Sequence, residues 1–297
     1  MRVLVIGASG LLGRALVEEW DSDEFDELIA ATSKDVDICD LGRVRKLISK
    51  SRPDWTVLTA AYTDVDGCEK NPELAHEINC VGASNVAREA RDYGSRLVFI
   101  STDYVFDGSK SAPYETEDPV APLSVYGRSK AAGERQVREI VPDACIVRTS
   151  WLFGPHGKCF PGTILRLSQD GGELKVVSDQ QGSPTFSRDL ASVIIRLVRG
   201  GASGTFHATN AGSCSWFEFA AELLKCAGFP DVQVAAISSE ELNRPAPRPR
   251  YSVLSCASLS RFGLSLRTWQ EAVRAYVREY VFPARAAAGR EAAAAQQ

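Results

Sequence analysis

Three glycines near the start of the chain, Gly7, Gly10 and Gly13, restrict what it can fold into more than any other feature. They follow the apolar run 3–6 and precede a helical pattern over 11–20. Glycines at this spacing permit a tight strand-to-helix turn, close approach of the backbone to a pyrophosphate, and unpaired N–H groups at the helix start. The spacing is G-x-x-G-x-x-G, and a simple tight turn is the alternative interpretation. The place of the motif directly after the first strand favours dinucleotide binding by Gly7, Ser9, Gly10, Leu11, Leu12 and Gly13.

Strand and helix patterns alternate from residue 1 to residue 150. The short β-rich runs predict strands at 3–6, 28–31, 55–59, 97–101 and 145–148. The helical patterns predict helices at 11–20, 44–49, 72–93 and 126–140, with Asn71 as the N-cap before Pro72. This alternation is typical of βαβ units, so we expect an α/β fold with a doubly wound, Rossmann-like parallel sheet.

The pattern becomes looser after Pro155 and predicts a second, smaller α/β substrate lobe over 151–283. We expect helices at 163–168 and 190–199, strands at 174–177 and 204–210, and loops at 180–187 and 244–251. Segments of 187–210 are expected to return to the dinucleotide-binding domain formed by 1–150. The alanine-rich end, 284–297, contains nothing that requires burial and is predicted to be a disordered tail.

The charged residues argue against one class of partner. Lys and Arg number 34 and Asp and Glu number 38, so the chain lacks the basic excess that binds nucleic acid. No apolar run approaches the roughly 20 residues that cross a bilayer. The chain enters its first strand with no room for a secretory signal. We therefore predict a cytoplasmic protein that binds neither nucleic acid nor a membrane.

Cysteine and histidine spacing favours no metal site. The eight cysteines contain no C-x-x-C pair, and the three histidines lie far apart in the sequence. The cysteines are expected to be reduced packing residues, and we predict no bound metal.

Tyr126 and Lys130 are four positions apart, which places both on one face of a helix. An ammonium near a phenol stabilises phenolate and lowers the tyrosine pKa, so that the phenol can exchange a proton with a carbonyl or hydroxyl. An ordinary exposed helix pair is the alternative. Thr102, at the end of the fourth predicted strand, can add a second hydroxyl, because ligands gather at the carboxyl ends of strands in such sheets. The predicted catalytic residues are therefore Thr102, Tyr126 and Lys130.

The second predicted strand ends without the acidic residue that accepts hydrogen bonds from the adenosine ribose of NAD. Ser33 and Lys34 stand there and could hold a 2′-phosphate, although a solvated loop lysine is the alternative. The cofactor is thus expected to be NADPH or NADH, with a lean toward NADP. After the third strand, the small side chains of Ala60 and Ala61 would let the cofactor lie against the backbone.

Several longer runs resemble a known family. They are Ser-Thr-Asp-Tyr-Val-Phe-Asp-Gly at 101–108, Pro-Leu-Ser-Val-Tyr-Gly-Arg-Ser-Lys at 122–130 and Arg-Thr-Ser-Trp-Leu-Phe-Gly at 148–154, with further matches at 179–185 and 248–254. Through these runs the chain is similar, along nearly its whole length, to the extended short-chain dehydrogenases, specifically the dTDP-4-dehydrorhamnose reductase family. The resemblance implies NADPH- or NADH-dependent reduction of the 4-keto group of a nucleotide-linked deoxysugar, dTDP-4-dehydro-L-rhamnose above others.

The resemblance also implies roles for individual residues. Tyr126 would donate a proton, Lys130 would lower its pKa and hold the nicotinamide ribose, and Thr102 would hydrogen-bond the reacting oxygen. The residues implied for the sugar pocket are Asp103, Tyr104, Val105 and Trp151, with Arg248 and Ser252 on a late loop. Those implied for the cofactor are Asp37 and Ile38 at the adenine and Ala60, Ala61 and Tyr62 along the pyrophosphate–ribose span.

Some positions depart from the family pattern. Certain members bind magnesium at a dimer contact through glutamates, but Ala15 and Arg188 stand at two of those positions, so a homodimer and a monomer are both open. Cys159 replaces a common asparagine before Phe160. The sequence therefore leaves metal-linked dimerisation and one loop contact in question.

Two other functions remain open from the sequence. Dehydratases of this superfamily contain Thr-Asp-Glu, whereas Tyr104 follows Asp103 here, which argues against dehydration; another nucleotide-sugar epimerase remains an alternative. The second alternative is a regulatory NADP-binding subunit resembling the methionine adenosyltransferase β subunit. The run Thr-Ser-Trp at 149–151 favours the reductase over that subunit.

Overall fold

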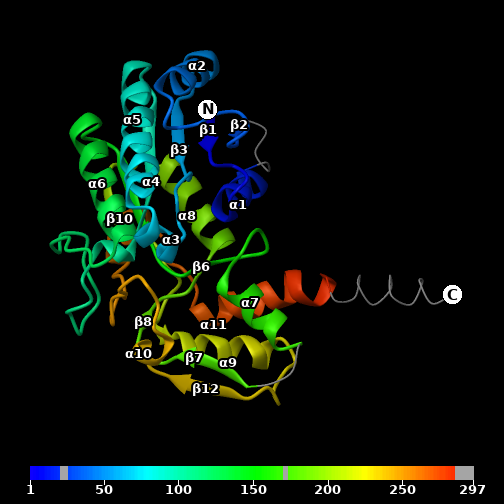
Figure 1. Cartoon of the computed structure of the whole chain (residues 1–297). Helices are drawn as coiled ribbons and strands as arrows, with labels where there is room; N and C mark the ends of the chain where they lie inside the picture. Colours follow the sequence, from blue (N-terminus) through cyan, green and yellow to red (C-terminus); the bar gives the residue numbers. More distant parts are fainter. Residues whose placement is uncertain (21–25, 170–172, 285–297) are drawn as a thin grey trace.

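The computed structural model describes residues 1–20, 26–169 and 173–284, and a six-stranded sheet lies at its centre (Figure 1). The strand order is β10-β5-β4-β3-β1-β2, and every neighbouring pair is parallel. The strands are β1 (Arg2–Ile6), β2 (Glu27–Ala31), β3 (Trp55–Leu58), β4 (Arg96–Thr102), β5 (Cys145–Thr149) and β10 (Gly204–His207). This sheet confirms the predicted α/β fold, and its strand order reverses direction at β1.

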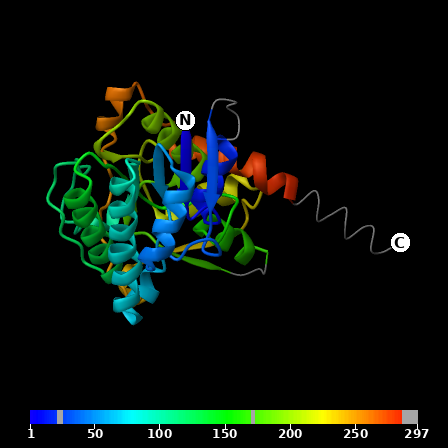
Figure 2. The ribbon, with the colours of Figure 1, turned by 90° about the horizontal axis from the view of Figure 1, so that it is seen from above.

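Successive strand residues point to opposite faces of the sheet, and a different set of helices covers each face. On one face, Val3 and Val5 share a core with residues of α1 (Leu11–Trp20) and α8 (Ser187–Arg199). On the other face, Leu4 and Ile6 share a core with residues of α2 (Leu41–Ser51), α5 (Ala83–Asp92) and α6 (Val125–Ile140). Figure 2, which views the molecule from above, shows α5 and α6 side by side.

Local capping decides where the helices begin. α2 begins at Leu41, earlier than predicted, because the Asp40 side chain accepts a hydrogen bond from the Arg43 N–H. α6 begins at Val125 because Ser124 caps it in the same way. The predicted helix 72–93 consists of α4 (Pro72–His76), a π-helical turn (Glu77–Gly82) and α5. Asn71 stands at the N-cap of α4 before Pro72, as predicted, but its side-chain amide donates to the Gly67 carbonyl of α3 (Val65–Lys70) and makes no capping hydrogen bond.

A second group of elements lies below the large sheet in Figure 1. Its paired strands are β7 (Leu174–Val177) with β12 (Val234–Ile237), β6 (Leu152–Phe153) with β9 (Thr185–Phe186), and β8 (Gln181–Gly182) with β11 (Cys214–Ser215). Its helices are α7 (Phe160–Leu167), α9 (Trp216–Cys226), α10 (Ser239–Leu242), α11 (Trp269–Tyr276) and a π segment (Val277–Val281), whereas the 3-10 segment Ala257–Phe262 packs against the large sheet. Phe153, Phe186 and Phe219 lie in a core that belongs to this group. The predicted loop 180–187 is wrong in part, because it contains β8 and β9.

Two later segments, α8 and β10, pack with the large sheet although they follow β7, β8 and β9 in the sequence. α8 shares its core with α1, and β10 pairs with β5 at the edge of the large sheet; β10 ends at His207, before the predicted 210. The lobe boundaries at residues 150 and 283 stay predictions. The predicted tail, 284–297, lies outside the described residues from 285 onward. None of the helices in the described ranges is both long and apolar enough to cross a membrane.

Candidate active site

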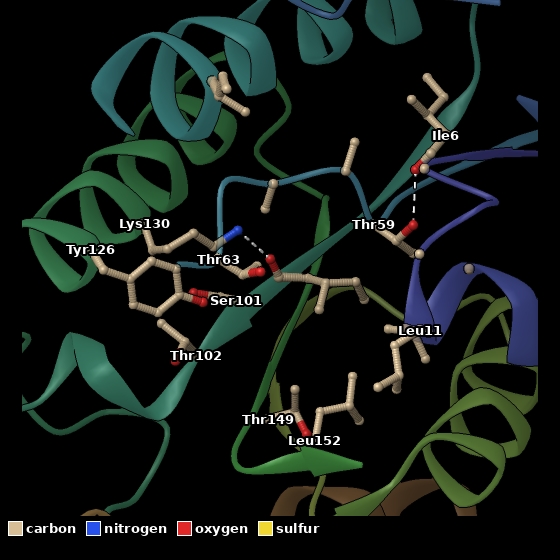
Figure 3. A pocket seen from close by; sticks show the side chains of 18 of the residues that line it. Ile6, Leu11, Thr59, Thr63, Ser101, Thr102, Tyr126, Lys130, Thr149 and Leu152 are labelled. Carbon is tan, nitrogen blue, oxygen red and sulfur yellow. Dashed lines mark hydrogen bonds between the residues drawn. The ribbon is translucent and has the colours of Figure 1, made fainter. Parts of the chain in front are cut away.

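A cavity of about 1040 Å³ lies at the carboxyl ends of the parallel strands, where doubly wound sheets bind ligands. Most predicted site residues line it: Gly7, Ser9, Gly10, Leu11, Leu12, Gly13, Asp37, Ile38, Ala60, Ala61, Thr102, Asp103, Tyr104, Tyr126, Lys130, Trp151 and Arg248. Figure 3 shows Thr102, Tyr126 and Lys130 gathered at the end of β4, with Leu11 across the cavity. The fold thus brings the glycine turn and the predicted catalytic residues to one place.

The glycine turn between β1 and α1 has no room for side chains. Gly7 has a φ of +96°, and a Cβ on it would lie 2.5 Å from the Ala60 nitrogen. A Cβ on Gly13 would lie 2.2 Å from the Gly7 carbonyl oxygen. The N–H groups of Gly7 and Ala8 both donate to the Ala31 carbonyl, which ties the turn to the end of β2. This close backbone packing, followed by a helix N-terminus, fits a dinucleotide pyrophosphate.

Lys130 is a buried cation on α6. Its ammonium donates a hydrogen bond to the Ile100 carbonyl of β4, with 2.7 Å between nitrogen and oxygen (Figure 3). The ammonium also lies 4.2 Å from the centre of the Phe99 ring. Burial lowers the pKa of Lys130 to about 8, against the opposing effect of the Glu134 carboxylate. The side chain is therefore still mostly charged at neutral pH and is held at the strand end.

The Tyr126 phenol lies beside Thr102 at the cavity wall, and its ring meets the Tyr104 ring edge-on at 5.9 Å between centres. Burial raises the pKa of Tyr126, while hydrogen bonding with Thr102 acts in the opposite direction. The expected lowering of this pKa by Lys130 is therefore not met in this structure: burial dominates, and the Lys130 ammonium points its hydrogen bond to the Ile100 carbonyl rather than to the phenol. A raised pKa keeps the phenol protonated at neutral pH, as a proton donor requires.

The turn after β4 holds two polar groups in the cavity wall. Thr102 Oγ1 donates to Asp103 Oδ1 over 3.0 Å and accepts from the Tyr104 N–H. Burial raises the pKa of Asp103 to about 7, although the Ser252 and Thr102 side chains favour its charged form. Asp103 Oδ2 and, on β5, Thr149 Oγ1 are buried without a hydrogen-bond partner among the described residues. Buried polar atoms are nearly always paired, so these two oxygens indicate a polar ligand.

Arg248 reaches the cavity from the proline-rich loop 244–251. Its guanidinium lies 3.0 Å from the Asp66 carboxylate of α3 and also donates to the Ala246 carbonyl. Burial raises the pKa of Tyr104, and the positive charge of Arg248 opposes that rise. The loop therefore delivers a fixed positive charge next to Tyr104.

Trp151 has a left-handed backbone, with a φ of +47°, which costs a residue other than glycine about 1–2 kcal/mol. Its ring stacks on Trp216, with centres 3.6 Å apart and planes 9° apart. The Trp216 indole N–H donates to the buried Gln180 side chain. A Cβ on Gly182 would lie 2.4 Å from the Trp151 ring, so only glycine fits there. Packing thus holds two indole rings in the cavity wall.

Three predicted site residues are absent from the cavity lining. Val105 is fully buried in a core with Phe106 and does not line the cavity. Tyr62 has its backbone N–H and carbonyl bonded to the Asn79 side chain. Ser252 is buried, and its side chain opposes the rise in the pKa of the Asp103 carboxyl. Their contribution to the site is indirect in this structure.

Several lining residues were not predicted: Thr32, Val36, Arg43, Thr59, Thr63, Val65, Ile78, Ile100, Ser101, Thr149, Ser150, Leu152, Lys158 and Trp216. Thr149, Ser150 and Leu152 lie within the run 148–154, which could have indicated them. Arg43 and Trp216 lie in no motif, and only the fold brings them to the cavity.

The departures from the family pattern have structural counterparts. Ala15 is buried within α1, and Arg188 of α8 forms ion pairs with Glu19 and Glu279. The Cys159 thiol donates to the Gly154 carbonyl and does not line the cavity. In the described ranges, no group of three or more His, Cys, Asp or Glu side chains could hold a metal ion. Through its two ion pairs, Arg188 of α8 links α1, which contains Glu19, to the π segment, which contains Glu279.

Comparisons with known proteins agree with this geometry. Residues 1–282 match the family model of the RmlD substrate binding domain. The spore coat polysaccharide biosynthesis protein SpsK of Bacillus subtilis is 41% identical over 278 residues, which cover 94% of this chain and 97% of that protein. A dTDP-4-dehydrorhamnose reductase of Mycolicibacterium smegmatis is 39% identical over 277 residues, covering 92% and 84%. The crystal structure of the dTDP-4-dehydrorhamnose reductase of Bacillus anthracis in complex with NADP has a TM-score of 0.90 and 40% identity, covering 94% and 99%. Because these matches span almost the whole sequence, the chain belongs to the dTDP-4-dehydrorhamnose reductase family.

Proposed function

We propose that this chain reduces the 4-keto group of a nucleotide-linked deoxysugar with NADPH or NADH, and that it converts dTDP-4-dehydro-L-rhamnose to dTDP-L-rhamnose. The observation that carries the proposal is the meeting of Thr102, Tyr126 and Lys130 at the end of β4, in the same cavity as the glycine turn. A nicotinamide cofactor, when bound, supplies the hydride for such a reduction. The names of the relatives and the NADP complex support the same reaction.

The residues of the cavity suit the two ends of the cofactor. Backbone N–H groups of the glycine turn would hold the pyrophosphate, and Asp37 and Ile38 would lie at the adenosine end beyond β2. Lys130 uses one N–H on Ile100, which leaves two donors for the hydroxyls of the nicotinamide ribose. Lys130 therefore orients the ribose while remaining fixed to β4.

Tyr126 would supply the proton. Reduction of a ketone develops negative charge on its oxygen, and the protonated phenol donates to that oxygen while Thr102 hydrogen-bonds it. The raised pKa of Tyr126 keeps the proton in place before reaction.

The substrate would lie against Asp103, Tyr104, Trp151 and Arg248. The unpartnered Asp103 Oδ2 can accept a hydrogen bond from a sugar hydroxyl, and the Arg248 guanidinium suits a diphosphate. Val105 and Ser252 would support this wall from behind.

The test is turnover of the purified chain with dTDP-4-dehydro-L-rhamnose and NADPH, followed by NADPH consumption and product analysis. We expect Tyr126→Phe to lower kcat by about 10²- to 10⁴-fold. Cofactor affinity should hardly change, because the ring stays. Conversion of a nucleotide sugar without net NADPH oxidation would indicate an epimerase. Tight binding to a methionine adenosyltransferase without turnover would indicate a regulatory subunit, and either result overturns the proposal.

A further inference from the structure

The cavity continues past the end of β2, the edge strand that lies three positions from β4 in the sheet. It is lined there by Thr32, Ser33, Asp37, Ile38 and Arg43. The Gly7 N–H donates to the Ala31 carbonyl at the end of β2. An adenosine ribose attached to a pyrophosphate at the glycine turn would therefore lie close to Thr32 and Ser33.

The acidic residues of this region are occupied by local bonds. Asp35 Oδ2 accepts from both the N–H and the hydroxyl of Thr32, and Asp35 does not line the cavity. Asp37 Oδ1 accepts from the Cys39 N–H, and Asp40 caps α2 by accepting from the Arg43 N–H. Asp37 is thus the acidic residue of this turn that lines the cavity, and it stands six positions beyond the end of β2, the end at which NAD-binding folds usually place the carboxylate that accepts from the ribose 2′-hydroxyl.

Two cationic residues, Lys34 and Arg43, follow β2 in the sequence, and they differ in whether they line the cavity. Arg43 lines the cavity, whereas Lys34, the cation favoured by the sequence, does not. The Arg43 guanidinium makes no hydrogen bond to the described residues, and its one charged contact is Asp40 at 3.5 Å. Ser33, which is exposed, also lines the cavity. A guanidinium with free donors binds a phosphate at two points.

We propose that Arg43, together with Ser33, binds the 2′-phosphate of NADPH, a phosphate monoester on the adenosine ribose, and so sets a preference for NADPH over NADH. This inference rests on the proposed use of a nicotinamide cofactor. It moves the phosphate site from Lys34 to Arg43, because only Arg43 faces the cavity.

The experiment measures binding by calorimetry with the full chain and no sugar substrate, so its failure is separate from failure of the reductase activity. The ligands are NADP⁺, NAD⁺, 2′,5′-ADP and 5′-AMP, and the variants are Arg43→Ala and the matched control Lys34→Ala. We expect Arg43→Ala to weaken NADP⁺ and 2′,5′-ADP by about 10- to 100-fold, the range for a lost charge-assisted contact. NAD⁺ and 5′-AMP should change by less than about twofold, and Lys34→Ala should leave all four affinities within about twofold. Arg43→Lys should recover part of the loss, since it restores the charge without the two-point geometry.

Three results would overturn the assignment. They are equal affinity of the unaltered chain for NADP⁺ and NAD⁺, an equal loss of both ligands in Arg43→Ala, and a larger loss of NADP⁺ in Lys34→Ala than in Arg43→Ala.

Discussion

The ammonium nitrogen of Lys130 and the carbonyl oxygen of Ile100 are 2.7 Å apart, in a hydrogen bond that joins α6 to β4. Ile100 precedes Thr102 by two residues on the strand, and Tyr126 precedes Lys130 by one helical turn. The bond therefore sets the position of the phenol relative to the strand end. Because the donor in this bond is the Lys130 ammonium, the protonation state of Lys130 affects how firmly α6 is held to β4.

We expect the activity of the chain to fall as the pH rises through about 8. Burial lowers the pKa of Lys130 to about 8, so the ammonium loses its proton in that range. Deprotonation removes one of the three N–H donors of Lys130, so that with Ile100 bound only one donor is left for the hydroxyls of the nicotinamide ribose. The measurement is kcat/KM against pH. In Lys130→Arg, the residual activity should lack this alkaline limb because guanidinium stays protonated. A profile of the unaltered chain that is flat to roughly pH 10 would contradict the assignment.

Asp103→Asn should stabilise the fold at neutral pH. The pKa of Asp103 is raised to about 7 in the fold from an ordinary value of 3.8, so the folded chain binds this proton more tightly than the unfolded chain. The stabilisation by this proton is complete below pH 4 and is lost as the pH rises through 7. We expect the Tm of the variant, relative to the unaltered chain, to increase across that window by at least about 2–4 °C. A difference in Tm that is the same at pH 4 and pH 8 would show that Asp103 is not the group involved.

Glu134→Gln should strongly destabilise the chain. Glu134 and Arg148 form a buried two-point ion pair, with 2.9 Å from Nε to Oε1 and 2.7 Å from Nη2 to Oε2. Loss of the carboxylate leaves a buried guanidinium without its counter-charge, at an expected cost of about 3–5 kcal/mol in the free energy of unfolding. Urea denaturation measures this. Glu139→Gln on the exposed face of the same helix is the control and should change it by less than about 0.5 kcal/mol. Similar effects in the two variants would argue against the buried pair.

Trp216→Ala should weaken the nucleotide sugar without affecting the cofactor. Trp151 stacks on Trp216 and has a strained backbone, so removal of the partner ring frees Trp151 to leave the wall. We expect KM for the nucleotide sugar to rise roughly 10-fold, while KM for NADPH stays constant. Trp216→Phe keeps an aromatic ring and should retain most of the affinity. An equal rise of both KM values would mean that Trp216 supports the whole cavity rather than its substrate side.

Local patterns predicted much of the first half of the fold. Strands β1 to β5 and helix α1 were found within a few residues, because buried parallel strands are short apolar runs and α1 has a clear apolar period. The later elements β12, α9 and α11 were not predicted. They are short segments that bury themselves against one another, as in the core of Phe153, Phe219 and Trp269. Such mutual burial has no signature within any one segment.

The sequence by itself determined the glycine turn, the parallel α/β fold, the family, and the presence of Tyr126 and Lys130 on one helix face. Only the tertiary structure decided that Lys130 bonds Ile100, that burial raises the pKa of Tyr126, that Trp216 backs Trp151, and that Arg43 faces the cavity while Lys34 does not. The reason is physical. Spacing along the chain reports neighbours within one helix or strand, whereas desolvation and contacts between distant segments exist only after those segments have packed together.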